Sequence, residues 1–220
     1  MVTILGIDEA GRGSVIGPLV VAGVMIDEKD HEELKRLGVK DSKMLSPEQR
    51  ERLYPLIKKL AKDYAVLKVS AKEIDELRKE KNLNIIEAER MAQIIKTLGA
   101  DRAYVDAPQV STEKFKAVLL NMAKNHTDII AENKADVNHP VCSAASIIAK
   151  VERDREVEKI KKIVGFNFGV GYSHDARSIE FVKKSLNEGT FLEYIRHSWS
   201  TVEDIKAERE QKSLDKFNSS

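Results

Sequence analysis

The sequence predicts an α/β fold, a mixed five-stranded sheet flanked by helices, with a helical extension at the carboxyl end. Five runs of apolar and β-branched residues have the length of strands. The first two runs, residues 2–9 and 19–27, are joined by a short glycine-rich loop, as in an antiparallel meander. Residues 102–106 and 128–132 instead flank a helical segment, and this spacing is typical of a parallel crossover.

The helices are marked by their ends. A short charged helix over residues 30–37 ends at Gly38, a residue suited to the left-handed position after a helix. The segment Ser46-Pro47-Glu48-Gln49 begins a second helix, because it combines an N-cap serine, a first-turn proline and a capping-box glutamine. The other expected elements are, in chain order, a strand at 65–69, an interrupted helical region at 70–98, and helices at 111–124, 140–164 and within 176–209.

Composition limits the classes of protein to which the chain can belong. The 220 residues fit one core domain over 1–170, with a helical region at 171–210 packed on it and a flexible tail at 211–220. Lys and Arg (37) nearly cancel Asp and Glu (36), so net charge neither supports nor excludes nucleic-acid binding. The single cysteine, Cys142, fits a buried thiol in a reducing compartment, and no apolar run reaches the ~20 residues of a membrane span. We expect a soluble, cytoplasmic monomer.

The opening of the chain carries the most informative pattern. A buried strand ends in Asp8 and Glu9, and a Gly-Arg-Gly loop, Gly11–Gly13, follows at once. Two adjacent acids at the end of a buried run are costly unless a positive charge lies between them. A divalent cation supplies such a charge, and the loop offers N–H groups and a guanidinium to a phosphate. A solvated hairpin turn, where acids and glycines are common, explains the same residues.

Two further acids lie at strand ends. Asp106 closes the run at 102–106, and Asp136 comes just after the run at 128–132. Ligand sites collect where the strands of α/β sheets end, so four acids in such positions favour a metal site. The histidines are scattered and have no zinc-ligand spacing; His139, near Asp136, is assigned a solvated role at a helix start.

Six short blocks occur in one order along the chain: Asp8-Glu9-Ala10-Gly11-Arg12-Gly13 followed by Gly17-Pro18, Asp41-Ser42-Lys43, Tyr104-Val105-Asp106, Lys134-Ala135-Asp136, Ser143 to Lys150, and Gly169-Val170-Gly171-Tyr172. Together they resemble the ribonuclease HII (type 2 RNase H) family, and the length and ending are similar to those of archaeal members. The resemblance implies an RNase H-like catalytic domain over residues 1–170. It implies an endoribonuclease that hydrolyses the RNA strand of RNA/DNA hybrids. The same resemblance implies cleavage at ribonucleotides embedded in duplex DNA, leaving 3′-OH and 5′-phosphate ends, with two Mg²⁺ or Mn²⁺ ions per site.

The resemblance also implies roles for individual residues. The catalytic residues and metal ligands would be Asp8, Glu9, Asp106 and Asp136, with Asp8 bridging both ions. The substrate-binding residues would be Gly11, Arg12, Gly13, Lys43, Ser146, Lys150 and Tyr172, of which the loop and the tyrosine would sense the 2′-hydroxyl. For Tyr172 taken alone, a turn tyrosine that closes the edge of the core is the alternative.

One helix face combines two hydroxyls and two cations. Ser143, Ser146, Lys150 and Arg153 are spaced three, four and three residues apart, and this polar stripe suits a row of phosphates. An ordinary solvated face is the alternative, and for Arg153 it is the preferred one.

The sequence departs from the family pattern at several positions. Met44 stands where a second lysine often follows, and Val170 stands where serine is typical. Ser173-His174-Asp175-Ala176-Arg177 replaces the more common Pro-Ser-Asp-Pro-Arg. These changes bear on one phosphate contact, on loop stiffness and on the preference for RNA–DNA junctions.

The tail resembles the clamp-binding box of replication proteins. Gln211, Leu214 and Phe217 have the spacing of that box, whereas Asn218 replaces its second aromatic residue. A short tail could fold to seat the two apolar side chains in a pocket of a sliding clamp. Chance matches to so short a pattern are frequent.

Two other classes of function compete with the endoribonuclease. A resolvase or DNA-repair nuclease would share the carboxylates and the fold, but it would have no 2′-hydroxyl for the loop and Tyr172 to read. A non-catalytic hybrid-binding or clamp-adaptor protein would have no use for four acids beside an anionic backbone.

Overall fold

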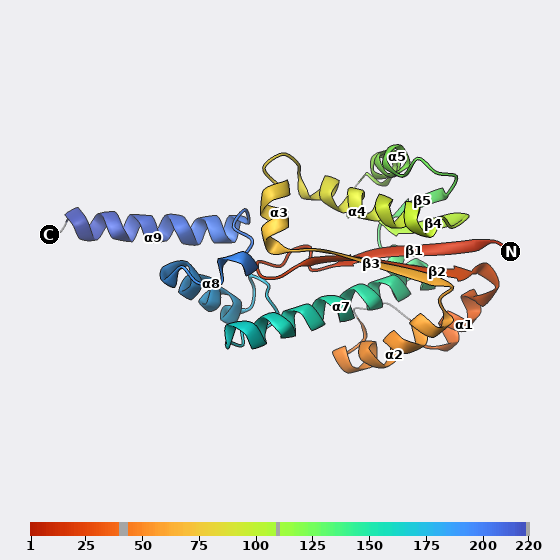
Figure 1. Cartoon of the computed structure of the whole chain (residues 1–220), viewed down its shortest axis with the longest axis horizontal. Coiled ribbons are helices and arrows are strands. Elements are labelled where there is room, and N and C mark those ends of the chain that lie inside the picture. Colours follow the sequence, from red (N-terminus) through yellow and green to blue (C-terminus); the bar gives the residue numbers. More distant parts are fainter. Residues whose placement is uncertain (40–43, 109–110, 219–220) are drawn as a thin grey trace. The chain divides into compact units, whose positions relative to one another are not determined.

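The structure is a computed structural model that describes residues 1–39, 44–108 and 111–218, with side chains as far as Gln211. Its five strands are β1 (Thr3–Ala10), β2 (Leu19–Asp27), β3 (Asp63–Val69), β4 (Arg102–Asp106) and β5 (Asp128–Glu132). They form one sheet in the order β3-β2-β1-β4-β5 (Figure 1). β1 pairs with β2 antiparallel and with β4 parallel, and β4 pairs with β5 parallel. The mixed five-stranded sheet expected from the sequence is confirmed.

The helices follow the expected order along the chain. They are α1 (His31–Arg36), α2 (Pro47–Leu60), α3 (Ala71–Leu77), α4 (Leu83–Leu98), α5 (Thr112–Ala123), α6 (Ala135–Asn138), α7 (Pro140–Val164), α8 (Ala176–Glu188) and α9 (Ser200–Asn218), with short 3₁₀ segments η1 (Glu28–Asp30) and η3 (Leu192–Tyr194). The capping box before α2 is present, since the side chains of Ser46 and Gln49 each accept from the other's backbone N–H. α9 continues to Asn218, beyond residue 210, where the sequence suggested that a flexible tail begins.

The chain divides into two compact units that do not follow the order of the sequence. The first unit comprises Met1–Arg12, Leu19–Lys68 and Lys81–Asp154; the second comprises Gly13–Pro18, Val69–Glu80 and Arg155–Ser220. The sequence-based division instead placed its boundaries near residues 170 and 210. Among the described residues, no helix combines the length and apolar character needed to cross a membrane.

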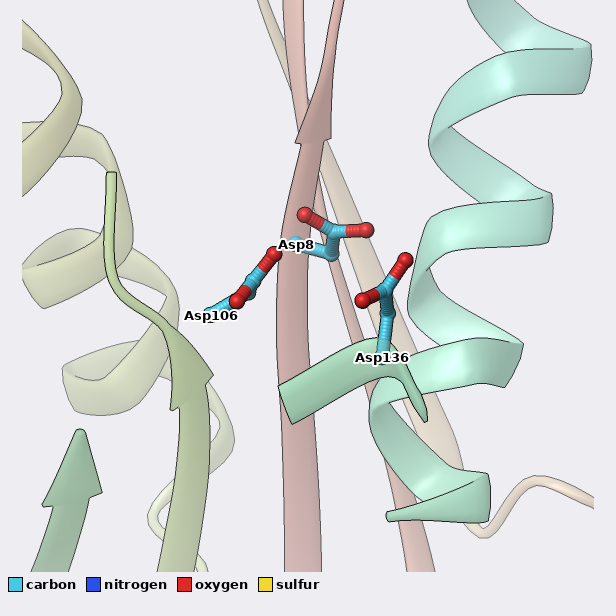
Figure 2. A group of neighbouring side chains, drawn as sticks. All are labelled: Asp8, Asp106 and Asp136. Atoms are coloured by element: carbon cyan, nitrogen blue, oxygen red, sulfur yellow. The ribbon is translucent and has the colours of Figure 1, made fainter. Parts of the chain in front are cut away.

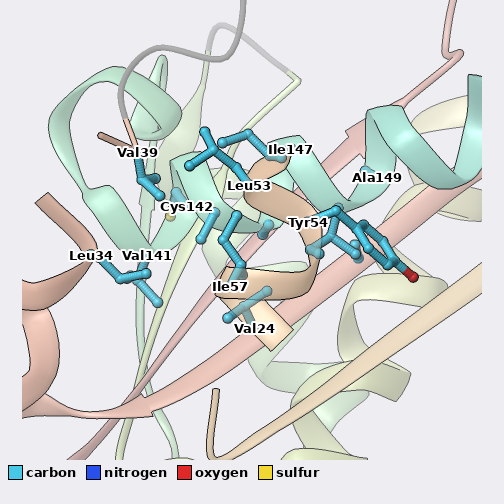
Figure 3. Packing of buried hydrophobic residues seen from close by; sticks show 14 of the residues in the cluster. Val24, Leu34, Val39, Leu53, Tyr54, Ile57, Val141, Cys142, Ile147 and Ala149 are labelled. Atoms are coloured by element: carbon cyan, nitrogen blue, oxygen red, sulfur yellow. The ribbon is translucent and has the colours of Figure 1, made fainter. Parts of the chain in front are cut away.

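The first unit packs helices on both faces of the sheet. On one face, buried residues of β1 and β2 contact α1, α2 and the first part of α7, and Val24, Leu53, Ile57 and Ile147 belong to this core (Figure 3). α4 and α5 cover the other face (Figure 1). Because side chains alternate along a strand, the β1 residues on the α7 side are those that share a face with Gly6. That face also carries Asp8.

α7 approaches β1 closely at one glycine. A Cβ built on Gly6 would lie 2.2 Å from the carbonyl carbon and oxygen of Val141 and 2.4 Å from the backbone nitrogen of Cys142. No side chain fits in that space, so only glycine lets the helix backbone rest on the strand at this position. The close approach places the polar residues of α7 beside the end of β1.

The second unit has its own apolar core, to which Ile16, Phe168, Phe181 and Ile195 contribute. Antiparallel bridges join Ser14 to Tyr172 and Ile16 to Ile195. The segment Gly13–Pro18 is therefore bonded to two stretches of chain from the carboxyl-terminal region.

Candidate metal centre

Three carboxylates from separate elements converge at the carboxyl ends of the parallel strands. The register that pairs Ile7 with Val105 places Asp8 and Asp106 one position further on in β1 and β4. Asp136 lies in α6, the short helix after β5, and the backbone N–H of Ala135 donates to Asp106 Oδ1 at 3.0 Å. One carboxylate oxygen from each of the three aspartates lies within 4.8 Å of the others (Figure 2).

The three carboxylates lie close together, and two of them are buried. Asp8 and Asp136 are only 4 % and 2 % exposed. Burial raises the pKa of Asp8 from 3.8 to about 7, a hydrogen bond from Ser146 opposes this rise, and the charge of Asp106 adds to it. A hard divalent cation with oxygen ligands would relieve the repulsion, so the donor set fits a metal of this class.

Glu9, the fourth expected ligand, lies outside this group of three. It follows Asp8 on β1 and therefore points to the other face of the strand. Its Oε2 atom is buried and has no hydrogen-bond partner among the described residues. Burial raises the pKa of Glu9 well above its usual value, and the charges of Asp8, Glu87 and Asp106 add to this, whereas Arg12 opposes it. A buried carboxylate oxygen without a hydrogen-bond partner among the described residues suits a metal ligand.

α7 presents Ser146 and Lys150 to the carboxylates. Lys150 Nζ donates to Ser146 Oγ at 2.7 Å, and Ser146 hydrogen-bonds to Asp8. Ser146 is fully buried, whereas Lys150 is half-buried. Both residues were expected to bind substrate. In the structure Ser146 contacts the candidate ligand Asp8, and Lys150 contacts Ser146.

The rest of the polar stripe on α7 is not solvated. Ser143 and Arg153 are 1 % and 5 % exposed, and the Arg153 guanidinium lies 3.4 Å from Asp154 Oδ1. The expectation that Arg153 lies on an ordinary solvated face is wrong. Helical periodicity showed which residues share a face, but the packing around α7 decides that this face is covered.

Arg12 is held by two residues that sequence reasoning missed. Its guanidinium pairs with Glu87, whose side chain is fully buried, and its Nη2 donates to Asn84 Oδ1 at 2.7 Å. Both partners lie on α4, three residues apart and so on one face. The sequence singled out neither residue, because α4 also carries Glu89, Arg90 and Lys96.

Tyr172 and Gly13 lie side by side in the second unit. A Cβ built on Gly13 would be 3.9 Å from Tyr172 Cε1, and the Tyr172 ring stacks on His174 with centroids 5.5 Å apart. Asp175 organises the loop, because its Oδ2 accepts from the N–H of Val170 at 3.0 Å. The turn around Tyr172 thus forms despite the departures from the family pattern.

Several other expected residues have simpler outcomes. Lys43 lies outside the described residues, and of the three tail residues only Gln211, which is exposed, has a described side chain. Cys142 is buried, as expected of a structural thiol, and burial raises its pKa well above the usual value. His139 is half-buried instead of fully solvated: it stacks on Tyr104 at 4.1 Å, and its Nε2 lies 3.0 Å from Glu132 Oε2.

A mixed sheet in this strand order, with carboxylates from β1, β4 and the segment after β5 meeting at one point, defines a metal-dependent hydrolase with the RNase H-like fold. The family model of ribonuclease HII matches residues 5–202. The chain belongs to the ribonuclease HII family. It is therefore a ribonuclease H, a nuclease that acts on RNA paired with DNA and depends on a divalent metal.

Individual relatives agree with this assignment. The chain is 43 % identical over 219 residues to ribonuclease HII of Pyrococcus furiosus, covering 96 % of each chain. It is similar to the crystal structure of ribonuclease H2 from Pyrococcus horikoshii, with a TM-score of 0.87, 42 % identity and coverage of 94 % of this chain and 98 % of that one. A PCNA:RNase HII complex from Archaeoglobus fulgidus gives a TM-score of 0.84 at 44 % identity, with coverage of 90 % and 96 %.

Proposed function

We propose that the protein cleaves phosphodiester bonds with two divalent ions, Mg²⁺ or Mn²⁺, held by Asp8, Glu9, Asp106 and Asp136. The observation that carries this proposal is the convergence of the three aspartates within 4.8 Å, with the buried Oε2 of Glu9 on the adjacent residue. When bound about 4 Å apart, such ions supply an activated water and stabilise the leaving oxygen. Cleavage by this route leaves 3′-OH and 5′-phosphate ends.

The remaining residues would orient the carboxylates and the substrate. Ser146 hydrogen-bonds to Asp8 and so favours the ionised form of one ligand. Lys150, half-buried beside Ser146, and Lys43 would offer cations to phosphates of the duplex. The backbone of Gly11–Gly13 and the hydroxyl of Tyr172 would recognise the ribose 2′-hydroxyl. The exposed Gly13 beside Tyr172 supports this role, since glycine allows a sugar to approach the backbone closely.

The proposed substrates are the RNA strand of RNA/DNA hybrids and single ribonucleotides embedded in duplex DNA. A labelled hybrid, a duplex with one ribonucleotide and a pure DNA duplex should be incubated with Mg²⁺, Mn²⁺ or EDTA. We expect cleavage of the first two only, and only with metal. Cleavage of pure DNA would favour a DNA nuclease, and cleavage in EDTA would rule out the metal mechanism.

The carboxylates can be tested one at a time. Replacing a residue that hydrogen-bonds to a metal ligand costs about 10–100-fold, so Asp106→Asn, which changes a proposed ligand itself, should cost at least that much activity. Asp128→Asn is a matched control, because Asp128 is an exposed aspartate at the opposite end of the neighbouring strand β5. Calorimetric titration with Mn²⁺ should show weaker binding to Asp106→Asn alone. Unchanged turnover in that variant would end the assignment.

We also propose that the carboxyl-terminal segment binds a sliding clamp. The Archaeoglobus fulgidus relative has been solved as a complex with PCNA, and Gln211, Leu214 and Phe217 match three positions of a clamp-binding box. Calorimetry of the full chain with an archaeal clamp should show binding that the Leu214→Ala/Phe217→Ala variant lacks. Equal binding by the two proteins would refute this role for the segment.

Finally, we propose that the protein acts in the cytoplasm as a monomer and serves DNA replication and repair. The single cysteine, which is buried, suits a reducing compartment. Light scattering at several concentrations tests the oligomeric state, and a mass that doubles with concentration would contradict it.

A further inference from the structure

Glu87 is a fully buried acid that the proposed metal chemistry does not use. It lies on α4 between the buried apolar residues Ile86 and Ala88, and its side chain is 0 % exposed. Burying a carboxylate is expensive unless a cation and further hydrogen bonds compensate for the lost water. Arg12, 75 residues away in the sequence, provides the cation, and its side chain is itself 34 % exposed.

The contact fixes Arg12 at two points. One terminal nitrogen, Nη1, pairs with Glu87 Oε2, and the other, Nη2, donates to Asn84 Oδ1 at 2.7 Å. Because the guanidinium is planar and rigid, two contacts to one helix face define both the position and the tilt of the group. The exposed part of the side chain is then held in one orientation.

Arg12 is also the only side chain available to anchor its loop. Its neighbours, Gly11 and Gly13, have none, and Gly11 adopts the left-handed backbone conformation with φ of +82°. Glycines give the backbone access to a ligand, but they add conformational freedom that must be removed for a defined geometry. A side chain fixed at two points between the two glycines removes part of that freedom.

We propose that Glu87 and Asn84 are positioning residues that hold Arg12 and, through it, the Gly11–Gly13 backbone in the geometry that recognises a ribose 2′-hydroxyl. This inference rests on the role that the proposed function gives to the loop.

The competing explanation is that Arg12 contacts only a phosphate and that Glu87 merely supports the fold. A phosphate contact contributes equally to binding of RNA/DNA and DNA/DNA, because both backbones carry the same charge. A loop that recognises the 2′-hydroxyl contributes to the hybrid alone. The ratio of the two affinities therefore separates the explanations.

The experiment measures binding by fluorescence anisotropy in EDTA, so that no strand is cut, with an RNA/DNA hybrid and a DNA duplex of one sequence. The variants are Arg12→Ala, Glu87→Gln, Asn84→Ala and Arg12→Ala/Glu87→Gln. Glu89→Gln is the matched control, because Glu89 is a second glutamate of α4 that pairs with Lys81 at 2.6 Å instead of with Arg12. Thermal unfolding is recorded for every protein.

We expect each single variant except the control to lower the hybrid-to-DNA affinity ratio by up to about tenfold, the value of one hydrogen bond. The double variant should be no worse than its more affected parent, because its two changes break one contact. Asn84→Ala keeps the test decisive if Glu87→Gln fails to fold, since it removes one hydrogen bond to Arg12 and leaves the pair with Glu87 in place.

Two results would overturn the proposal in different ways. In the first, the wild-type protein prefers the hybrid, and the variants either keep this preference or lose affinity for both duplexes equally. That result would refute the positioning role alone. In the second, the wild-type protein has equal affinity for hybrid and DNA. That result would refute 2′-hydroxyl recognition by the loop, and with it the proposed specificity for RNA-containing substrates.

Discussion

Lys150 donates a hydrogen bond from Nζ to Ser146 Oγ at 2.7 Å, one turn apart on α7, and Ser146 in turn hydrogen-bonds to Asp8. The two interactions link a cation on a helix to a candidate metal ligand on a strand. Both favour the ionised form of Asp8, against the burial that disfavours it. The link exists because Gly6 lets α7 rest directly on β1.

Ser146→Ala should shift the pH dependence of cleavage. The variant lacks a hydrogen bond that favours ionised Asp8, so the pKa of Asp8 should rise further, by about one unit for a bond of ordinary strength. The acid limb of kcat/KM against pH should then move to higher pH. Ser185→Ala is the control, because Ser185 is a buried serine of α8; it should leave the pH dependence of kcat/KM unchanged. A uniform loss at every pH would instead indicate that Ser146 contacts the substrate.

The metal-free protein should lose stability as the pH rises. The pKa of Asp8 is about 7 in the folded protein and 3.8 ordinarily, so the folded state binds this proton more tightly. The stabilisation is complete below pH 3.8 and is lost as the pH rises through about 7. Asp8→Asn cannot ionise, and it should therefore melt at a higher temperature than wild type at pH 8 in EDTA.

Two comparisons check this assignment. At pH 5 in EDTA the difference in Tm between Asp8→Asn and wild type should be smaller than at pH 8, because the loss of stability that begins above pH 3.8 is then only partly complete. At pH 8, Mg²⁺ should raise the Tm of wild type more than that of Asp8→Asn, because bound metal stabilises the folded state. A difference in Tm that is the same at pH 5 and pH 8 would show that Asp8 titrates as in the unfolded chain.

Gly6→Ala should destabilise the first unit strongly. The added Cβ would lie 2.2 Å from the Val141 backbone, which cannot move without lifting α7 off the sheet. Overpacking of this kind typically costs 1–3 kcal/mol, and backbone contacts put this variant at or above about 3 kcal/mol. Gly99→Ala is the control: its Cβ would meet nothing within 4 Å, so only backbone strain of about 1 kcal/mol applies. Urea unfolding measures both, and equal costs would contradict the close approach.

The strands and the three aspartates were predictable because they depend on local pattern. Apolar runs of strand length, followed by acids, identified Asp8, Asp106 and Asp136, and parallel pairing necessarily brings the ends of β1 and β4 together. The capping box at Ser46 is equally local. Local pattern and tertiary structure agree at these positions.

The remaining parts of the site depend on packing between distant segments. Arg153 shares a helix face with Lys150, yet that end of the face is covered, which periodicity cannot reveal. In the sequence, Glu87 looks like any other charged residue of an amphipathic helix, because its partner Arg12 is 75 residues away. His139 stacks on Tyr104 only because the chain turns back after β5. Each of these outcomes is set by tertiary contacts.

Tyr172→Phe should weaken cleavage of ribose-containing substrates while the fold is kept. The backbone bridge from Ser14 to Tyr172 does not involve the side chain, and the phenylalanine ring can still stack on His174. Only the hydroxyl is lost, and a hydrogen bond to the substrate is worth about tenfold in kcat/KM. Steady-state kinetics on a hybrid and on a duplex with one ribonucleotide measure this loss.

Tyr194→Phe provides the matched control, since Tyr194 is a half-buried tyrosine of η3 in the same unit. We expect Tyr172→Phe alone to lower kcat/KM on both substrates, with the Tm of the two variants unchanged. If Tyr172→Phe cleaves both substrates at the wild-type rate, the hydroxyl contacts no ribose and the tyrosine only closes the edge of the core. If Tyr172→Ala then lowers the Tm without changing the ratio of the two rates, that structural role is the remaining one, because the ring packs beside Gly13 at 3.9 Å.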